Sequence, residues 1–273
     1  RVCIMMKRND IYYQNSKGEV VSLVRQPYMM LADTDIFDYT WKDGIRQTDN
    51  RSIKVVISGA THNAYQYALK RLTNMLEYDT THGTYGRLYY KGWYLKCRLS
   101  ACTRPASFIM RQMSTMEYTI SIDSASPGWH KDITHTYKYA DTTLFEGKGY
   151  PYGYPYGYNA VLSTNASVDI ADSGLYDVLI KIRPNEAVAS PIIRVGAYTY
   201  GAQGIGLDVG QVMTINTATR TIDIDGGNIF SRRVSDDMLH KAEFETGTQA
   251  VLWNDNFDFD LTLIAERSEP TWI

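Results

Sequence analysis

Cysteine is scarce in this sequence, with three residues among 273: Cys3, Cys97 and Cys102. An odd count without paired spacing argues against a disulfide-stapled scaffold and is typical of a protein that folds in a reducing compartment. Long hydrophobic runs are also missing, because no apolar stretch approaches the ~20 residues that a membrane-spanning helix needs. No signal peptide is recognised, although the chain begins at Arg1 and a processed start therefore stays open. We expect a protein without a membrane span.

Charge of one sign is not concentrated anywhere in the chain. The formal net charge is -2 and lysine and arginine are spread along the sequence. The basic block that marks a nucleic-acid-binding surface is therefore missing. Apolar residues make up 44% and charged residues 21%, which is close to the average of soluble globular proteins and excludes wholesale disorder. A length of 273 residues suits one large β domain or two domains of ordinary size.

Recognisable catalytic motifs are missing too: the sequence has no G-x-S-x-G, no catalytic-cysteine signature and no H-E-x-x-H. The pairs that come nearest to a ligand or acid–base pattern are His130 with His135, Cys97 with Cys102, Asp223 with Asp225, and Asp258 with Asp260. A spacing of five places the histidines and the cysteines on opposite faces of a strand, where they cannot converge on a metal. The aspartates fall on the solvent faces of strands. We therefore predict no catalytic, metal or cofactor site and a protein that is not an enzyme.

Tyrosine is abundant, with 22 residues, and tyrosine favours both strands and interfaces. Alternating apolar residues predict strands at 51–57, 116–122, 176–182 and 256–264. Strands at intervals of about 8–12 residues are typical of sandwiches. The pattern predicts a mainly β protein with two domains, a β domain carrying one helix and then an all-β sandwich, joined near residues 130–150.

One helix is expected at about 62–77, with Thr61 as its N-cap. Its apolar side carries Tyr65, Ala68, Leu69, Leu72, Met75 and Leu76 at helical spacing. We expect this side to pack against a sheet. Any interface role of the helix would belong to its other side, which carries Gln66, Lys70, Arg71 and Asn74.

Residues 149–159 read GYPYGYPYGYN, a repeat that places a tyrosine at every second position. In an extended segment the tyrosines would share one face, and they are Tyr150, Tyr152, Tyr154, Tyr156 and Tyr158. Pro151 and Pro155 lack the N–H that a central strand needs. We predict a semi-rigid connector whose tyrosine face packs on a domain or on a neighbouring subunit. A ligand-binding aromatic strip is the alternative.

Several stretches in order along the chain carry a resemblance to a known family. They are residues 22–25, 41–44, 50–59, the end of the helix at 72–76, and then 85–90, 209–222 and 225–230. Together they resemble the distal tail protein family of long-tailed bacteriophages, which is also found in prophages and tail-derived particles. The resemblance implies an N-terminal β-sandwich or split-barrel-like domain at 1–140. It also implies a C-terminal galectin-like β-sandwich at 141–273, entered through residues 149–159.

The function implied by the resemblance is that of a structural hub at the virion tail tip, assembled in the bacterial host cytoplasm. The N-terminal domain would form a hexameric ring on the tail tube protein, with DNA passing through its lumen. The ring would connect to a tail-associated lysin or fibre hub, and the C-terminal sandwich would carry receptor-binding or baseplate proteins. Glu117 and Asp123 are candidates for an acidic lumen surface along which DNA slides.

Three other functions stay open. A carbohydrate-binding adsorption module would stack sugars on exposed aromatic residues such as Trp253, although a core or interface position is the expectation for this residue. Another tail-tube or baseplate protein would share the β architecture. A wall hydrolase is the least favoured, because no catalytic signature accompanies it.

Overall fold

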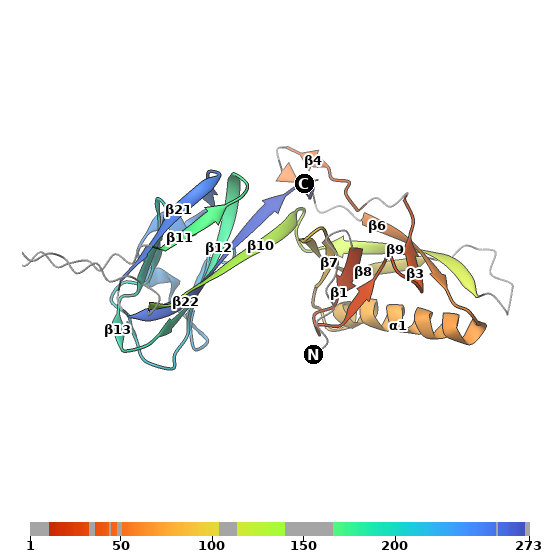
Figure 1. Cartoon of the computed structure of the whole chain (residues 1–273), viewed down its shortest axis with the longest axis horizontal. Coiled ribbons are helices and arrows are strands. Elements are labelled where there is room, and N and C mark those ends of the chain that lie inside the picture. The colour runs from red at the N-terminus through yellow and green to blue at the C-terminus, as the bar shows by residue number, and fades with distance from the viewer. Residues whose placement is uncertain are drawn as a thin grey trace, which may run out of the picture. The chain divides into compact units, whose positions relative to one another are not determined.

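The computed structural model describes residues 11–32, 36–43, 45–47, 51–103, 114–139, 166–254 and 256–270, without the side chains of residues 45 and 46. Strands dominate, and the prediction of a mainly β protein with one α-helix is confirmed for the described residues. The chain forms two compact units, Arg1–Lys131 with Glu266–Ile273 as the first and Asp132–Ala265 as the second (Figure 1). The domain limits expected from the sequence, 1–140 and 141–273, stay predictions because residues 140–165 lie outside the described part.

The strands of the first unit form one antiparallel sheet in the order β2-β1-β7-β8-β9-β6-β3. Their bounds are β1 (Ile11–Gln14), β2 (Val20–Ser22), β3 (Tyr28–Met30), β6 (Arg51–Ser58), β7 (Gly86–Tyr90), β8 (Trp93–Thr103) and β9 (Thr115–Ser124). The N–H of Met30 donates to the carbonyl of Leu23, 2.7 Å away, just after β2. The two ends of this sheet therefore meet. A separate hairpin consists of β4 (Trp41–Lys42) and β5 (Ile45–Arg46).

The strand pattern read from the sequence is clearest in β6, where Ile53, Val55 and Ile57 are buried between half-exposed neighbours. β6 pairs with β9 along its whole length, from Arg51 opposite Ile122 to Ser58 opposite Thr115. Alternation of this kind buries one face of the sheet and leaves the other to solvent.

The α-helix α1 (His62–Thr81) covers the buried face of this sheet. It begins at Thr61, whose hydroxyl accepts the N–H of Ala64 at 3.2 Å, as the sequence predicts. Its buried residues are Tyr65, Ala68, Leu72, Met75, Leu76 and Asp79. The helix ends at Thr81 rather than at about residue 77, because the side chain of Asp79 is held by tertiary hydrogen bonds that sequence periodicity does not reveal.

The second unit consists of two main sheets. One has the order β19-β18-β17-β12-β22-β10, with β20 also paired to β12, and the other has the order β11-β21-β14-β15. Their bounds are β10 (Trp129–Tyr137, which begins in the first unit), β11 (Ala166–Ile170), β12 (Gly174–Pro184), β14 (Ile192–Val195), β15 (Tyr198–Gly201), β17 (Met213–Asn216), β18 (Thr221–Ile224), β19 (Gly227–Asn228), β20 (Ala242–Phe244), β21 (Gly247–Trp253) and β22 (Phe257–Arg267). Two short strands, β13 (Val188–Ala189) and β16 (Gly206–Leu207), pair with each other.

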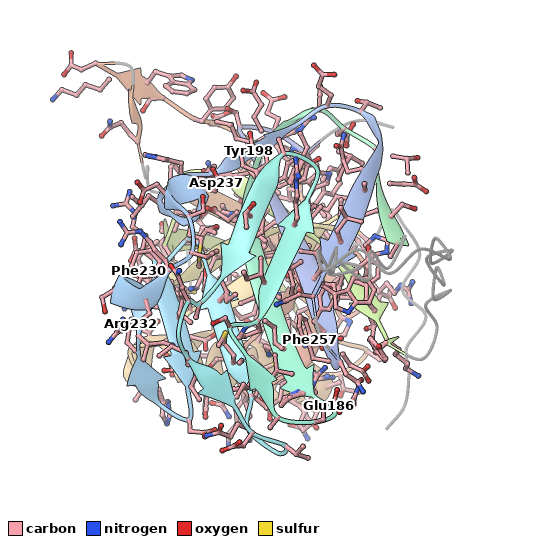
Figure 2. All side chains as sticks on the ribbon, turned by 90° about the vertical axis from the view of Figure 1, so that its left-hand side faces the viewer. Glu186, Tyr198, Phe230, Arg232, Asp237 and Phe257 are labelled. Carbon is pink, nitrogen blue, oxygen red and sulfur yellow. The ribbon has the colours of Figure 1, made fainter. Side chains whose placement is uncertain are left out.

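The core of the second unit lies between these sheets. β12 and β22 pair from Tyr176 opposite Ala265 to Pro184 opposite Phe257, and Phe259 of β22 meets Trp253 of β21 edge-on, with ring centroids 5.0 Å apart. Two 3-10 helices, Phe230–Arg232 and Asp236–Leu239, complete the described part of the unit. The second of them meets β15 where the N–H of Thr199 donates to Asp237 at 2.9 Å, at the end marked by Tyr198 and Asp237 in Figure 2. This arrangement agrees with a β-sandwich. None of the described helices is long and apolar enough to cross a membrane.

Candidate interface groove on the helix

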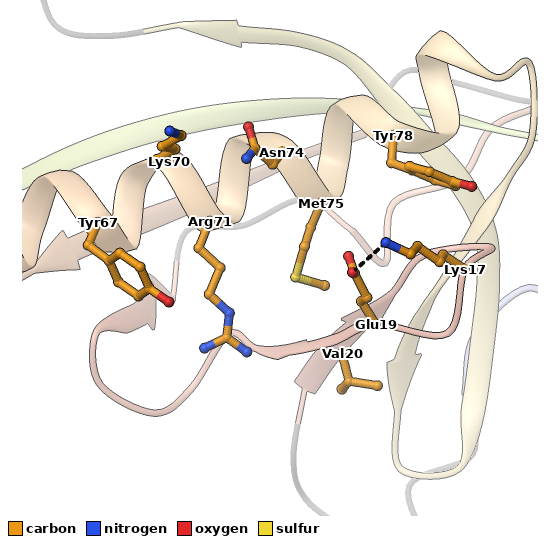
Figure 3. A pocket seen from close by; sticks show the side chains of 9 residues that line it. All are labelled: Lys17, Glu19, Val20, Tyr67, Lys70, Arg71, Asn74, Met75 and Tyr78. Carbon is orange, nitrogen blue, oxygen red and sulfur yellow. Dashed lines mark ion pairs between the residues drawn. The ribbon is translucent and has the colours of Figure 1, made fainter. Parts of the chain in front are cut away.

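A groove of about 700 Å³ lies between α1 and the turn that joins β1 to β2 (Figure 3). Its lining residues are Lys17, Glu19, Val20, Tyr67, Lys70, Arg71, Asn74, Met75 and Tyr78. We call this set the helix groove. It brings together three of the four helix residues that the sequence singled out as an interface. The fourth, Gln66, is exposed on the same helix and lies 3.5 Å from the His62 ring nitrogen, outside the groove.

Helical spacing produces one wall of the groove. Tyr67, Lys70, Arg71, Asn74 and Tyr78 recur at intervals of three and four residues and therefore share a face of α1. That face is opposite to the one that packs on the sheet. Tyr67 is 73% exposed, which is unusual for a large aromatic ring within a helix.

The turn between β1 and β2 produces the other wall. Asn15 closes this turn, because its side-chain oxygen accepts the N–H of Glu19 at 2.8 Å, and Gly18 takes the left-handed conformation with φ 89°. Lys17 and Glu19 form an ion pair of 3.1 Å across the turn, drawn as a dashed line in Figure 3. The Glu19 carboxylate accepts a hydrogen bond from the Lys17 ammonium, and this bond holds the pKa of Glu19 below its usual range.

A buried carboxylate fastens the two walls together. The Asp79 side chain accepts hydrogen bonds from the Tyr13 hydroxyl at 2.5 Å, from the Ser16 N–H at 3.0 Å and from the Thr84 hydroxyl at 2.9 Å. Burial alone raises the pKa of Asp79, but the bonds from Ser16, Tyr13 and Thr84 outweigh burial and leave that pKa below its usual value. Burial and the same contact raise the pKa of Tyr13. The end of α1 is thus fixed to the turn that carries Lys17 and Glu19.

The groove has an excess of positive charge. Lys17 is offset by Glu19, whereas no ion pair joins Lys70 or Arg71 to a carboxylate in the part of the chain that the structure describes. Exposed cations of this kind favour an acidic or aromatic partner.

A second hollow of about 380 Å³ continues the groove along α1. It is lined by residues of the loops next to β3 and β6, among them Pro27 and Gly59, and it shares Tyr67 and Arg71 with the first hollow. The two hollows therefore form one surface with Tyr67 standing between them. A long, shallow surface of this shape suits a protein segment better than a small molecule.

The other predicted site residues do not join the groove. Glu117 and Asp123 both lie on the outer face of β9, since the residues that alternate with them, Tyr118, Ile120 and Ile122, are the buried ones. Asp123 forms an ion pair of 3.1 Å with Arg98 on β8, so its charge is offset. Their place in a lumen stays a prediction.

Trp253 is 4% exposed and its ring contacts Tyr137 and Phe259. A ring in this position presents no free face on which a sugar could stack, in agreement with the core position that the sequence favoured. The tyrosine face at Tyr150, Tyr152, Tyr154, Tyr156 and Tyr158 lies outside the described residues.

The remaining candidates from the sequence are the histidine, cysteine and aspartate pairs. Among the described residues no three His, Cys, Asp or Glu side chains converge to hold a metal. Cys97 is buried, which raises the pKa of its thiol to about 12, and Cys102 is exposed on the same strand. Asp258 and Asp260 are engaged with Asn185 and Arg183, respectively, rather than with each other.

Sequence reasoning singled out three of the nine groove residues as an interface and missed the others, among them Lys17, Glu19, Tyr67 and Tyr78. Two of these come from a turn that precedes the helix by more than forty residues, and no periodicity connects them to it. Tyr67 gave a signal that could have been used, because it falls on the polar side of the predicted helix.

Comparison with known proteins identifies the fold. No protein-family model matches the sequence, and no curated protein sequence matches it. A chain of the phage P2 baseplate in its activated conformation with calcium superimposes with a TM-score of 0.53 at 13% identity, covering 94% of this chain and 98% of that one. A chain of the same baseplate with strontium gives a TM-score of 0.52 at 12% identity, covering 96% and 99%. The Dit protein of phage SPP1, described as a paradigm of the hub adsorption apparatus in phages that infect Gram-positive hosts, gives 0.48 at 9% identity, covering 93% and 94%. The two reported structures that share this fold with a TM-score above 0.5 are chains of a phage baseplate.

Proposed function

We propose that this protein is a distal tail protein, the structural hub at the end of a bacteriophage tail or of a tail-derived particle. The observation that carries the proposal is the extent of the structural match. One chain of the phage P2 baseplate and this chain cover each other almost from end to end, so that both units are matched in order. A shared single domain would support a much broader range of functions.

In this proposal the first unit assembles into a ring of six copies on the tail tube protein, and DNA passes through its lumen during infection. The second unit, a galectin-like sandwich, carries receptor-binding or other baseplate proteins, and the ring connects below to a tail-associated lysin or fibre hub. The chain acts by assembly and not as an enzyme. It works at the virion tail tip after assembly in the host cytoplasm.

The helix groove gives the first unit a surface suited to such assembly. It is shallow, it exposes an aromatic ring in Tyr67, and it carries cations in Lys70 and Arg71 that form no ion pair with a carboxylate among the described residues. Aromatic residues and arginine are enriched at protein–protein interfaces. A carbohydrate-binding module is less favoured, because Trp253 lies in the core of the second unit.

The proposal is tested by assembly and by location. The 31.1 kDa chain, purified alone or co-expressed with candidate tail tube and baseplate proteins of the same particle, should form rings that light scattering and electron microscopy detect as about six copies. Gold-labelled antibody should bind intact particles at the tail tip. A chain that stays monomeric alone and with these partners contradicts the proposal, and antibody labelling along the whole tail would favour a tail-tube subunit instead.

A further inference from the structure

The helix groove and the second hollow form one elongated surface along α1. The helix lines both of them, from Ala64 in the second hollow to Tyr78 in the groove. Residues 64–78 of an α-helix extend over about 21 Å, at about 1.5 Å per residue. An extended polypeptide covers that distance with about six residues. The surface therefore has the length of a short extended peptide.

The bottom of this surface is apolar. Val20 and Met75 contribute to it in the groove, and Pro27 and Ala68 contribute in the second hollow. Tyr67 lines both hollows and is 73% exposed. Figure 3 shows Tyr67 and Met75 extending from α1 toward the turn between β1 and β2. A partner with one apolar or aromatic side chain can pack that side chain against the Tyr67 ring.

The charges of the surface are unbalanced. Its cations are Lys17, Lys70 and Arg71, and its one carboxylate is Glu19. Glu19 forms its ion pair with Lys17 and is also exposed to the positive field of Arg71. Asp79, at the same end of α1, does not line the groove, and the cations outnumber the carboxylates even when Asp79 is counted. This excess of positive charge attracts an acidic partner.

Asn74 favours a polypeptide over a nucleic acid as that partner. Its side chain is exposed and makes no hydrogen bond within the part of the chain that the structure describes. An amide side chain can donate to the C=O of a peptide unit and accept from an N–H. A phosphodiester offers acceptors only. Nucleic-acid surfaces also carry a longer series of cations than the three found here.

We infer that the helix groove and the second hollow bind an extended acidic segment of another protein, about six residues long, with an apolar or aromatic side chain on Tyr67 and carboxylates beside Lys70 and Arg71. Short acidic motifs are recognised by clustered cations in this way. The inference rests on the proposed function, because assembly supplies such a partner, and it adds the chemistry of that partner. A nucleic acid and a second copy of this chain are the competing occupants.

A display library of random peptides tests the inference without knowledge of the natural partner. The library is selected against the full chain. Enriched peptides should contain more acidic than basic residues and one large apolar residue. A fluorescent synthetic copy of the most enriched peptide should bind the chain in an anisotropy titration. Its affinity should fall as the salt concentration rises, because ions screen the attraction between exposed charges.

Two variants locate the binding. Lys70→Glu with Arg71→Glu should weaken binding of the selected peptide at least about tenfold, because carboxylates would then oppose carboxylates. Tyr67→Ala should weaken it about fivefold through lost packing. All three side chains are exposed, so circular dichroism and the melting temperature should match the wild type. The charge-matched control is Lys181→Glu with Arg232→Glu, at exposed positions of the second unit, and it should bind the peptide as the wild type does.

A charge-reversed peptide, with lysine at each acidic position, gives the sharpest result. It should not bind the wild type but should bind the variant with Lys70→Glu and Arg71→Glu, since reversal on both sides restores the attraction. Failure of this rescue would show that the two cations do not contact the acidic residues of the peptide, and it would overturn the inference.

Other outcomes also overturn the inference. They are no enrichment, enriched peptides that are not acidic, and equal binding to the wild type and to the variant with both cations reversed. If labelled single-stranded DNA binds the wild type and not this variant, and no acidic peptide is selected, the groove belongs to a nucleic acid. If this variant loses rings that the wild type forms, the occupant is a second copy. The hub function is tested separately, by ring formation and by location on the particle, so one test can fail without the other.

Discussion

Replacement of Asp79 by asparagine tests how the helix groove is held in shape. Asp79 is fully buried and accepts three hydrogen bonds, two on one carboxylate oxygen and one, from Tyr13, on the other. Asparagine keeps the shape but replaces one oxygen by an NH₂ group. The amide oxygen can still accept hydrogen bonds from Ser16 and Thr84. The NH₂ group must then face Tyr13, so the Tyr13 hydroxyl has to rotate and accept a hydrogen bond instead of donating one.

The expected loss follows from these bonds. A hydrogen bond to a charged group contributes about 1.5–3 kcal/mol and a neutral one about 1 kcal/mol. Two bonds weaken and one is reversed, so we expect Asp79→Asn to lower the free energy of unfolding of the first unit by about 2–3 kcal/mol. Asp79→Ala leaves the buried Tyr13 hydroxyl without an acceptor and also removes the bonds from Ser16 and Thr84, and it should lower the free energy of unfolding by about 4 kcal/mol.

The loss has a defined pH dependence. The pKa of Asp79 is lowered in the folded protein, and an aspartate in the unfolded chain titrates near about 3.9. The stability that the charged form contributes is therefore fully present above that value and disappears as the pH falls through the lower, folded pKa. The difference between wild type and Asp79→Asn should be constant from about pH 5 to 8 and shrink below about pH 4.

The measurement must report on the first unit alone, because two compact units can unfold separately. Urea unfolding followed by hydrogen exchange of the α1 amides meets this need. Asp208→Asn is the matched control, since Asp208 is exposed in the second unit and should change stability by less than about 0.5 kcal/mol. Equal midpoints for the two variants, or a difference that persists unchanged to low pH, would refute the role of the Asp79 charge.

Three further outcomes are expected. Tyr65 and Tyr118 share a buried hydroxyl–hydroxyl hydrogen bond, so each change to phenylalanine should cost about 1–2 kcal/mol while the double change costs less than the sum; additive urea-unfolding energies would contradict this. Alanine at Gly86 places a Cβ 2.6 Å from the Gln14 carbonyl oxygen and should lower stability by about 2–3 kcal/mol, whereas an unchanged melting temperature would show that the backbone yields freely. A disulfide reagent at about pH 8 should modify exposed Cys102 in the folded protein and leave Cys97 unmodified, because burial raises the pKa of the Cys97 thiol to about 12. Peptide mass spectrometry identifies which cysteine is labelled, and rapid labelling of Cys97 would contradict its burial.

Local periodicity made much of the fold predictable. The alternation in β6 and β22 and the helical spacing in α1 are properties of neighbouring residues, and the buried faces follow from them directly. The end of α1 was misjudged because Asp79, Thr80 and Thr81 resemble a loop in composition. Only contacts with Tyr13 and Ser16, distant in sequence, explain why the helix continues.

Only a third of the groove residues were predictable, for the same reason. The polar side of α1 points to an interface through its spacing alone, and Lys70, Arg71 and Asn74 were found in this way. The facing turn at Lys17 and Glu19 is placed there by the β1–β7 pairing and by Asp79, which are long-range contacts. Nothing in the local sequence of either segment encodes that meeting.

The path of the chain between the units has a consequence for how such a protein can change. The chain leaves the first unit after Lys131 and returns to it at Glu266, within β22, so the second unit is an insertion with both ends joined to the first. A genetic exchange that replaces the second unit must therefore have two crossover points, one on each side of residues 132–265. A single crossover near residue 131 would also replace the last segment of the first unit. Exchange of the second unit without loss of any part of the first thus requires a cassette rather than a new C-terminal half.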